Sequence, residues 1–206
     1  MMKNLVFVGG LIVVSLFFVR QFLEQSKKKV KNIPENPTRI VAFGDDYTLG
    51  KGVGSHEGYP SVLQDLLGKT VENMGVKDET TASALHRLES VFASNKPDIV
   101  VLTLGVADIN SRLPLEKTLE NLEKIFLYLL ERNVMVVYGG ISPPKVGDNW
   151  LMAISQLCGT LGVLYIGDIM HDFWDNKTLM TDALFPNAEG YRLIANKLEE
   201  GMRDYF

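Results

Sequence analysis

The fold is decided by Arg39-Ile40-Val41-Ala42-Phe43-Gly44-Asp45-Asp46-Tyr47-Thr48-Leu49-Gly50. The unbroken apolar run at its start predicts a strand buried on both faces, as in a parallel sheet. Gly44 and Asp45 are typical of the tight turn that ends such a strand. We therefore expect Asp46 at the carboxyl end of a buried strand, where open α/β sheets place their binding and catalytic sites.

Four further apolar runs of strand length follow, at residues 71–74, 99–105, 134–138 and 163–166. Between them, apolar residues recur at helical spacing, and residues 187–205 form the last such segment. Strict alternation of strands and helices is typical of a parallel sheet covered on both faces. The sequence predicts an α/β fold, a three-layer α/β/α sandwich around a five-stranded parallel sheet.

The composition suits one globular domain after an apolar leader. Of the 206 residues, 46% are hydrophobic and 22% are charged, and the formal net charge is -4. This acidic balance offers no basic surface, so nucleic acid is not an expected partner. Cys158 is the single cysteine, which excludes a disulfide framework and a thiolate metal site. A buried structural thiol is expected.

The leader has the character of a membrane anchor. Residues 5–19 are apolar apart from two glycines and one serine, and Lys3 and Arg20 flank them. The run is shorter than the ~20 residues of a comfortable span, and snorkelling by Arg20 would extend it. A secretory signal peptide is the alternative, but no small-x-small cleavage site follows. We expect an uncleaved single-pass transmembrane helix within residues 1–25, in contact with membrane lipid at the cell membrane.

A basic, proline-containing linker is expected over residues 26–37, followed by one domain over 38–206. Pro34 and Pro37 stiffen the linker because each disfavours helix at the residue before it. Four lysines within residues 27–31 favour a cytoplasmic domain by the positive-inside rule. The alternative is that they contact anionic headgroups on whichever face they emerge.

Three more short blocks follow the later strands. They read Asn73-Met74-Gly75, Gly105-Val106-Ala107-Asp108 and Asp182-Ala183-Leu184-Phe185-Pro186-Asn187. In order, spacing and flanks, the four blocks resemble those of the SGNH (GDSL) hydrolases, in particular the bacterial lysophospholipase, thioesterase and arylesterase branch. The resemblance extends from Arg39 to the end of the chain and implies the flavodoxin-like SGNH fold.

The resemblance also assigns catalytic positions. The family uses a serine nucleophile, a histidine base, an orienting aspartate and an oxyanion hole of two backbone N–H groups and an asparagine amide. Asp46 stands at the nucleophile position, and Gly75 and Ala107 stand at the oxyanion positions. Asp182 stands at the triad aspartate position and Phe185 at the histidine position. Serine, asparagine and histidine are therefore replaced.

Other residues near the expected rim offer substitutes. His171 follows the fifth strand and is the candidate surrogate base. Lys77 follows the second strand, and an ion pair between Lys77 and Asp46 would fill the old pocket. The alternative is a divalent cation held by Asp46, Asp108 and Asp182, since hard cations take carboxylate oxygens. No other cofactor is expected.

Two functions follow from these residues. The first is a membrane-anchored, non-catalytic SGNH-like protein that acts as a binding or assembly module for a protein or a lipid-like ligand. The second is a weak or unorthodox lipid or acyl esterase that uses Asp46 with His171 or a metal ion. The loss of three catalytic identities favours the first. Because many members of the resembled family are exported, the membrane face of the domain stays open.

Overall fold

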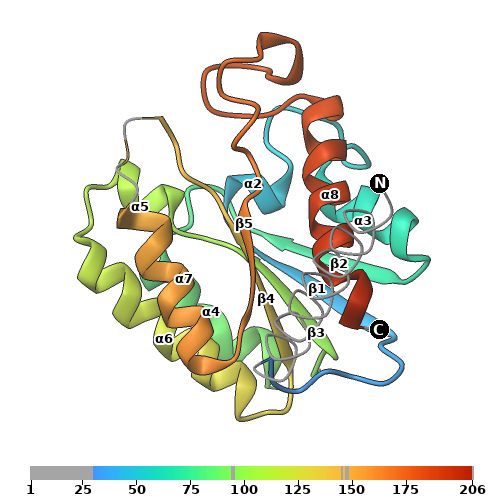
Figure 1. The fold of residues 1–206 in the computed structure, drawn as a ribbon, viewed down its shortest axis with the longest axis vertical. Helices are drawn as coiled ribbons and strands as arrows, with labels where there is room; N and C mark the ends of the chain where they lie inside the picture. The colour runs from blue at the N-terminus through green and yellow to red at the C-terminus, as the bar shows by residue number, and fades with distance from the viewer. Residues whose placement is uncertain (1–29, 94–95, 145, 147–148, 206) are drawn as a thin grey trace, which may run out of the picture.

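The computed structural model describes residues 30–93, 96–144, 146 and 149–205 (Figure 1). The predicted transmembrane helix lies outside these residues. None of the helices within them combines the length and the apolarity that a membrane span requires.

Five parallel strands form one sheet, as predicted. They are β1 (Arg39–Gly44), β2 (Thr70–Gly75), β3 (Ile99–Thr103), β4 (Met135–Gly140) and β5 (Leu164–Asp168), in the order β2-β1-β3-β4-β5. Every residue of β3 and β4 is buried, as their unbroken apolarity predicts. Gly44 pairs with Gly75 on one side and with Thr103 on the other, so three strands end at the same level.

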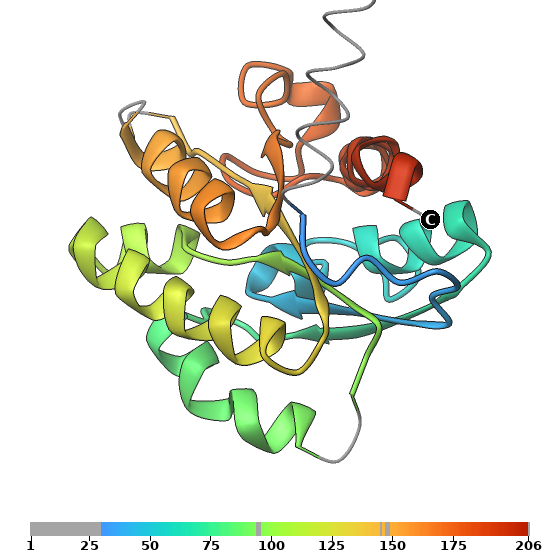
Figure 2. The same cartoon turned by 60° about the horizontal axis from the view of Figure 1, so that its bottom comes forward.

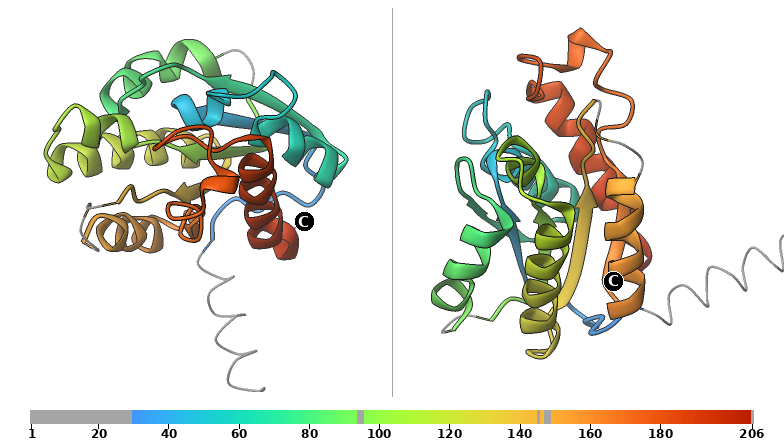
Figure 3. Two further views of the ribbon diagram at one scale, coloured as in Figure 1. Left: turned by 90° about the horizontal axis from the view of Figure 1, so that it is seen from above. Right: turned by 90° about the vertical axis from the view of Figure 1, so that its left-hand side faces the viewer.

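Helices cover both faces of the sheet (Figures 2 and 3). The α-helices are α2 (Asp46–Leu49), α3 (Tyr59–Leu67), α4 (Thr81–Phe92), α5 (Val106–Asn110), α6 (Leu115–Leu130), α7 (Asn149–Leu161) and α8 (Ala188–Met202). The described residues also contain the 3-10 helices η1 (Lys177–Leu179), between β5 and α8, and η2 (Arg203–Tyr205), after α8. Helices α3 and α8 pack on one face and α4, α6 and α7 on the other.

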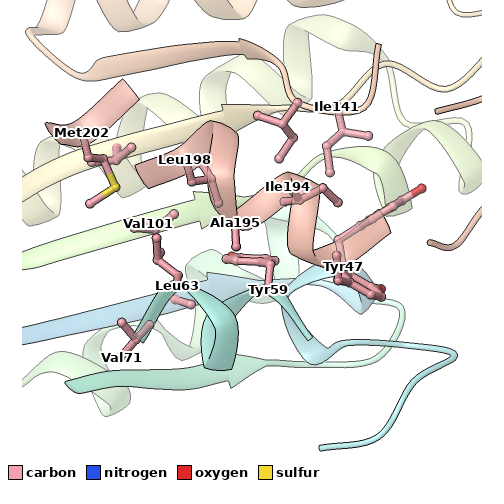
Figure 4. Close-up of a cluster of buried hydrophobic side chains, with 14 of the residues drawn as sticks. Tyr47, Tyr59, Leu63, Val71, Val101, Ile141, Ile194, Ala195, Leu198 and Met202 are labelled. Atoms are coloured by element: carbon pink, nitrogen blue, oxygen red, sulfur yellow. The ribbon is translucent and has the colours of Figure 1, made fainter. Parts of the chain in front are cut away.

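Each face has its own core because successive strand residues point to opposite sides. Figure 4 shows Leu63 of α3 and Leu198 of α8 in one buried cluster with Val101 of β3. The neighbouring Leu102 belongs to the opposite cluster. Cys158 of α7 is also buried there, and burial raises the pKa of its thiol to about 12. This confirms the predicted structural thiol.

The chain enters the domain at the amino ends of the strands, whereas α2 lies at their carboxyl ends. The Lys31 N–H donates to the Gly162 carbonyl at 2.9 Å, just before β5. The Asn32 side-chain amide donates to the carbonyls of Leu130 and Val134, at 2.8 and 3.2 Å, just before β4. Part of the segment predicted as a linker is therefore fixed to the amino ends of these strands.

Candidate functional site

Asp46 lies just after the carboxyl end of β1, at the edge of the sheet where the strands end. Asp45 caps helix α2, and its Oδ1 accepts a hydrogen bond from the Tyr47 N–H at 3.1 Å. The helix is one turn long and ends at Gly50, whose φ of 84° lies in the left-handed region that favours glycine. This turn brings the next residue, Lys51, back over the helix, and its N–H donates to the Asp46 carbonyl at 3.0 Å.

A pocket of about 240 Å³ opens at this rim. It is lined by Asp45, Asp46, Tyr47, Lys51, Asp78, Val106, Ala107, Asn110, Ser111, Leu184 and Phe185. The lining therefore includes Asp46, Ala107 and Phe185, which the resemblance assigns to three different catalytic positions. The carboxyl end of the parallel sheet brings them together, as expected for this class of fold.

Lys51 lies between Asp46 and Phe185. Its Nζ is 3.0 Å from Asp46 Oδ1 and 4.3 Å from the centroid of the Phe185 ring. The contact with the Asp46 carboxylate raises the pKa of the Lys51 ammonium. Asp46 is buried, and its Oδ2 accepts a hydrogen bond from the Asp78 N–H at 2.8 Å. The Lys51 ammonium thus contacts a buried carboxylate on one side and an aromatic ring on the other.

The predicted ion pair between Lys77 and Asp46 is wrong, because Lys51 makes it. Lys77 is 70% exposed, and its Nζ lies 3.8 Å from Asp78 Oδ2. The sequence contains a signal that could have placed Lys51 next to Asp46, namely Gly50 directly after the short segment that begins at Asp46. A one-turn helix that ends at a glycine returns the chain toward its own first residue.

Tyrosine side chains fix the groups around Lys51. The Tyr191 hydroxyl donates to the Lys51 carbonyl at 3.1 Å, so the backbone of this residue is tied to α8. The Tyr47 hydroxyl donates to the Leu184 carbonyl at 2.9 Å, and the Tyr47 and Phe185 rings lie 5.3 Å apart between centroids. The loop that carries Phe185 is therefore held against α2.

Asp182 stabilises its own loop. Its Oδ1 accepts hydrogen bonds from the N–H groups of Leu184 and Phe185, each at 2.8 Å. Its side chain is exposed and belongs to a separate pocket with Trp174 and Lys177. The phenyl ring at position 185 offers no N–H for a carboxylate to orient.

The N–H of Gly75 is already engaged. It donates to Asn73 Oδ1 at 2.9 Å. Ala107 is buried at the start of α5 and has no side-chain donor. Two of the donor groups that the resemblance requires for an oxyanion hole are therefore not offered to the pocket.

The model of the GDSL-like lipase/acylhydrolase family matches residues 42–193. The chain belongs to this family. It is 24% identical over 196 residues to an arylesterase of Vibrio mimicus, and the alignment covers 90% of this chain and 93% of the relative. It is 26% identical over 128 residues to esterase TesA of Pseudomonas aeruginosa, with coverage of 59% and 64%.

Solved structures agree with this fold. The psychrotrophic esterase EstA from Pseudoalteromonas sp. superposes with a TM-score of 0.74 at 23% identity, over 82% of this chain and 98% of that one. A member of the lipolytic protein G-D-S-L family from Veillonella parvula superposes with a TM-score of 0.69 at 18% identity, over 79% and 97%. These likenesses establish the family fold for the chain.

Asp108 lies outside the pocket lining and is fully buried. Its Oδ1 accepts hydrogen bonds from the hydroxyls of Thr81 and Thr118, and its Oδ2 accepts one from the Thr81 N–H at 2.8 Å. These partners lie on α4 and α6, whereas Asp108 lies on α5. Its prediction as a pocket residue is wrong, because this carboxylate connects three helices.

The alternative of a divalent cation held by Asp46, Asp108 and Asp182 also finds no support in the geometry. Among the residues that the structure describes, no three His, Cys, Asp or Glu side chains come together as a metal site requires. Asp46 instead faces the Lys51 ammonium, and the Asp108 oxygens accept hydrogen bonds from protein donors. The Asp182 Oδ1 is likewise engaged by backbone N–H groups.

His171 does not contribute to the pocket. It lies after β5 with an exposed side chain, and its N–H donates to the Asp168 carbonyl at 3.3 Å. It is absent from the described residues that line the pocket around Asp46. The geometry therefore gives no support to His171 as a surrogate base.

Proposed function

We propose that this chain is a non-catalytic member of its family, anchored to a membrane by residues 1–25, that binds a ligand or a partner in the pocket around Asp46. The observation that carries the proposal is the position of Lys51 between Asp46 and Phe185. In the resemblance, those two positions belong to the serine and the histidine that exchange a proton. Here a lysine ammonium compensates a carboxylate, and the neighbouring ring has no acid or base function.

The electrostatics of the pocket oppose acyl transfer. Ester cleavage needs donors aimed at the oxygen that becomes negative, and removal of one donor typically slows such reactions by about 10²–10³. Ala107 supplies none, and the N–H of Gly75 is bonded to Asn73. A carboxylate nucleophile would also need a base to activate the water that releases the acyl group. No histidine lines the pocket within the described residues.

The position at which the chain enters the domain supports an anchor that is attached at the end of the sheet opposite to the pocket. Lys31 and Asn32 are fixed at the amino ends of β4 and β5, whereas the pocket lies at the carboxyl end of β1. An anchor that precedes Val30 would leave the pocket directed away from its point of attachment.

Ester hydrolysis is the second candidate function. Two relatives named arylesterase and esterase favour it, as does the apolar side of the pocket, where Val106, Leu184 and Phe185 would suit an acyl group. In this case Asp46 would have to take part in the chemistry. The two candidate functions therefore differ in whether ester hydrolysis depends on Asp46.

The test is hydrolysis of short-chain and long-chain p-nitrophenyl esters by the full 206-residue chain. We expect the natural sequence and Asp46→Asn to show the same background rate. The combined variant Asp46→Ser/Ala107→Asn/Phe185→His, with and without Lys51→Ala, tests whether the scaffold still accepts an ester. Turnover by the natural sequence that Asp46→Asn abolishes would overturn the non-catalytic proposal and establish the second candidate.

A further inference from the structure

The pocket around Asp46 has an acidic and aromatic lining. Asp46 and Asp78 contribute carboxylates, and Tyr47 and Phe185 contribute rings. Lys51 is the single basic residue of this lining in the part of the chain that the structure describes. Apart from Lys51, the pocket therefore presents the groups that attract a cation.

Asp46 Oδ1 is buried beneath Lys51. No hydrogen bond of ordinary geometry reaches this oxygen from the described residues, and Lys51 Nζ at 3.0 Å compensates its charge as an ion pair. On its other side, the same ammonium lies 4.3 Å from the centroid of the Phe185 ring. A buried carboxylate opposite an aromatic ring is an arrangement that holds organic ammonium groups.

The Lys51 side chain has a second position within reach. It is 37% exposed, and its Nζ lies 4.0 Å from Asp78 Oδ1, on a side chain that is 70% exposed. The backbone of Lys51 is held by the Tyr191 hydroxyl, so rotation of the side chain alone would move the ammonium toward Asp78. That rotation would leave Asp46 and Phe185 free for an external cation.

We propose that Asp46 and Phe185 form a binding site for an organic ammonium group, which Lys51 occupies when no ligand is present. The proposal rests on the binding role given under Proposed function and names the class of ligand. The ammonium comes from a small amine or quaternary ammonium compound, or from a lysine side chain of a partner. The bound group takes the place of the Lys51 ammonium, which then pairs with Asp78.

Competition with Lys51 determines the affinity. A tethered group acts at an effective concentration in the millimolar range or above, so an external amine must displace it. Removal of the Lys51 ammonium should therefore tighten amine binding by about tenfold or more. Neutral molecules of the same shape should gain nothing, because the buried carboxylate recognises charge.

The chain contains a matched control for this arrangement. Lys197 Nζ lies 3.1 Å from Asp172 Oδ2 and 5.0 Å from the centroid of the Phe173 ring. The same three residue types thus meet, but the Asp172 side chain is 72% exposed. Water screens an exposed carboxylate, so Lys197→Met should create no amine site.

The experiment is titration calorimetry on the full chain in a non-ionic detergent, with n-butylammonium, choline and the neutral analogue 3,3-dimethylbutanol as probes. We expect Lys51→Met to bind an ammonium probe about tenfold more tightly than the natural sequence does. Binding should disappear in Lys51→Met/Asp46→Asn, and Lys197→Met should bind the probe no more tightly than the natural sequence does. Preference for n-butylammonium indicates a lysine side chain or primary amine, and preference for choline indicates a quaternary ammonium.

Lys51→Ala and far-ultraviolet circular dichroism guard against loss of folding in Lys51→Met. A folded Lys51 variant that binds no ammonium probe would overturn the proposal. Equal binding of 3,3-dimethylbutanol, or binding that persists after Asp46→Asn, would also overturn it. Ester hydrolysis measured on the same samples is an independent readout. If the chain hydrolyses esters and also binds the ammonium probe, only the non-catalytic role is overturned. If it neither hydrolyses esters nor binds the probe, only the ammonium-binding proposal is overturned.

Discussion

A Cβ on Gly75 would lie 2.1 Å from the backbone nitrogen of Leu49. Strand β2 and helix α2 therefore meet backbone to backbone beside Asp46. Gly75→Ala must separate them, since neither backbone can yield as a side chain would. We expect a loss of about 1–3 kcal/mol in the free energy of unfolding, measured by urea titration.

Gly159→Ala is the control for that substitution. Gly159 lies within α7, and no atom would come within 4 Å of an added Cβ. Alanine is the better helix former, so the free energy of unfolding should rise by about 0.5–1 kcal/mol. Equal effects of the two substitutions would contradict the close approach of Gly75 and Leu49.

Asp108 should be important for stability rather than for binding. Asp108→Ala leaves the Thr81 N–H and the hydroxyls of Thr81 and Thr118 without their buried acceptor. Each unsatisfied buried group costs about 1–3 kcal/mol, so we expect a loss of about 3 kcal/mol or more in urea unfolding. Asp65→Ala on the exposed side of α3 should leave the stability unchanged. If Asp108→Ala left the free energy of unfolding unchanged, these hydrogen bonds would be dispensable for stability.

Asp45 should make stability depend on pH. Burial raises the pKa of its carboxyl group well above the ordinary value, and the carboxylates of Asp46, Glu79 and Asp108 raise it further. In the unfolded chain this group loses its proton near pH ~4, whereas the folded chain keeps the proton to higher pH. The folded state then binds more protons, so the contribution of Asp45 to stability falls as pH rises above about 4.

Asp45→Asn removes this titration and keeps an acceptor for the Tyr47 N–H. The free energy of unfolding of the variant minus that of the natural sequence should therefore be more positive at pH 7 than at pH 4. Urea unfolding of both proteins at both pH values measures this difference. A difference between the two proteins that stays constant with pH would contradict the raised pKa.

Asn32 should stabilise the entry of the chain in two separable ways. Its φ of 58° lies in the left-handed region, and its side-chain amide bonds to the carbonyls of Leu130 and Val134. Asn32→Gly removes the hydrogen bonds alone, whereas Asn32→Ala also meets the steric cost of this backbone conformation. Thermal unfolding should show Asn32→Ala to be less stable than Asn32→Gly by about 1 kcal/mol. The reverse order would exclude a role for the backbone conformation.

The predicted central strands are confirmed because burial on both faces imposes a pattern that the sequence carries directly. Residues 99–105 are an example, since β3 occupies Ile99–Thr103 and every residue of it is buried. The helical segment expected over residues 187–205 is likewise present as α8, at Ala188–Met202. In each case the period of the apolar residues matches the period of the element, and local pattern is sufficient.

The candidate site was only partly predictable. Asp46, Ala107 and Phe185 line one pocket, because the ends of parallel strands and the loops after them meet at one edge. Lys77 and Asp108 follow the second and third strands closely in sequence, which predicts them in the same pocket. Lys77 is exposed beside Asp78, and Asp108 turns away toward α4 and α6.

The sequence by itself determined the alternation of strands and helices, the two cores and the replacement of serine, asparagine and histidine in the family's blocks. These properties depend on residue identity and periodicity, which are local. Only the tertiary structure decided that Lys51, and not Lys77, neutralises Asp46, and that Asp182 supports its own loop. A contact between side chains depends on the direction in which each backbone leaves its turn, and that direction is set by packing between segments distant in the chain.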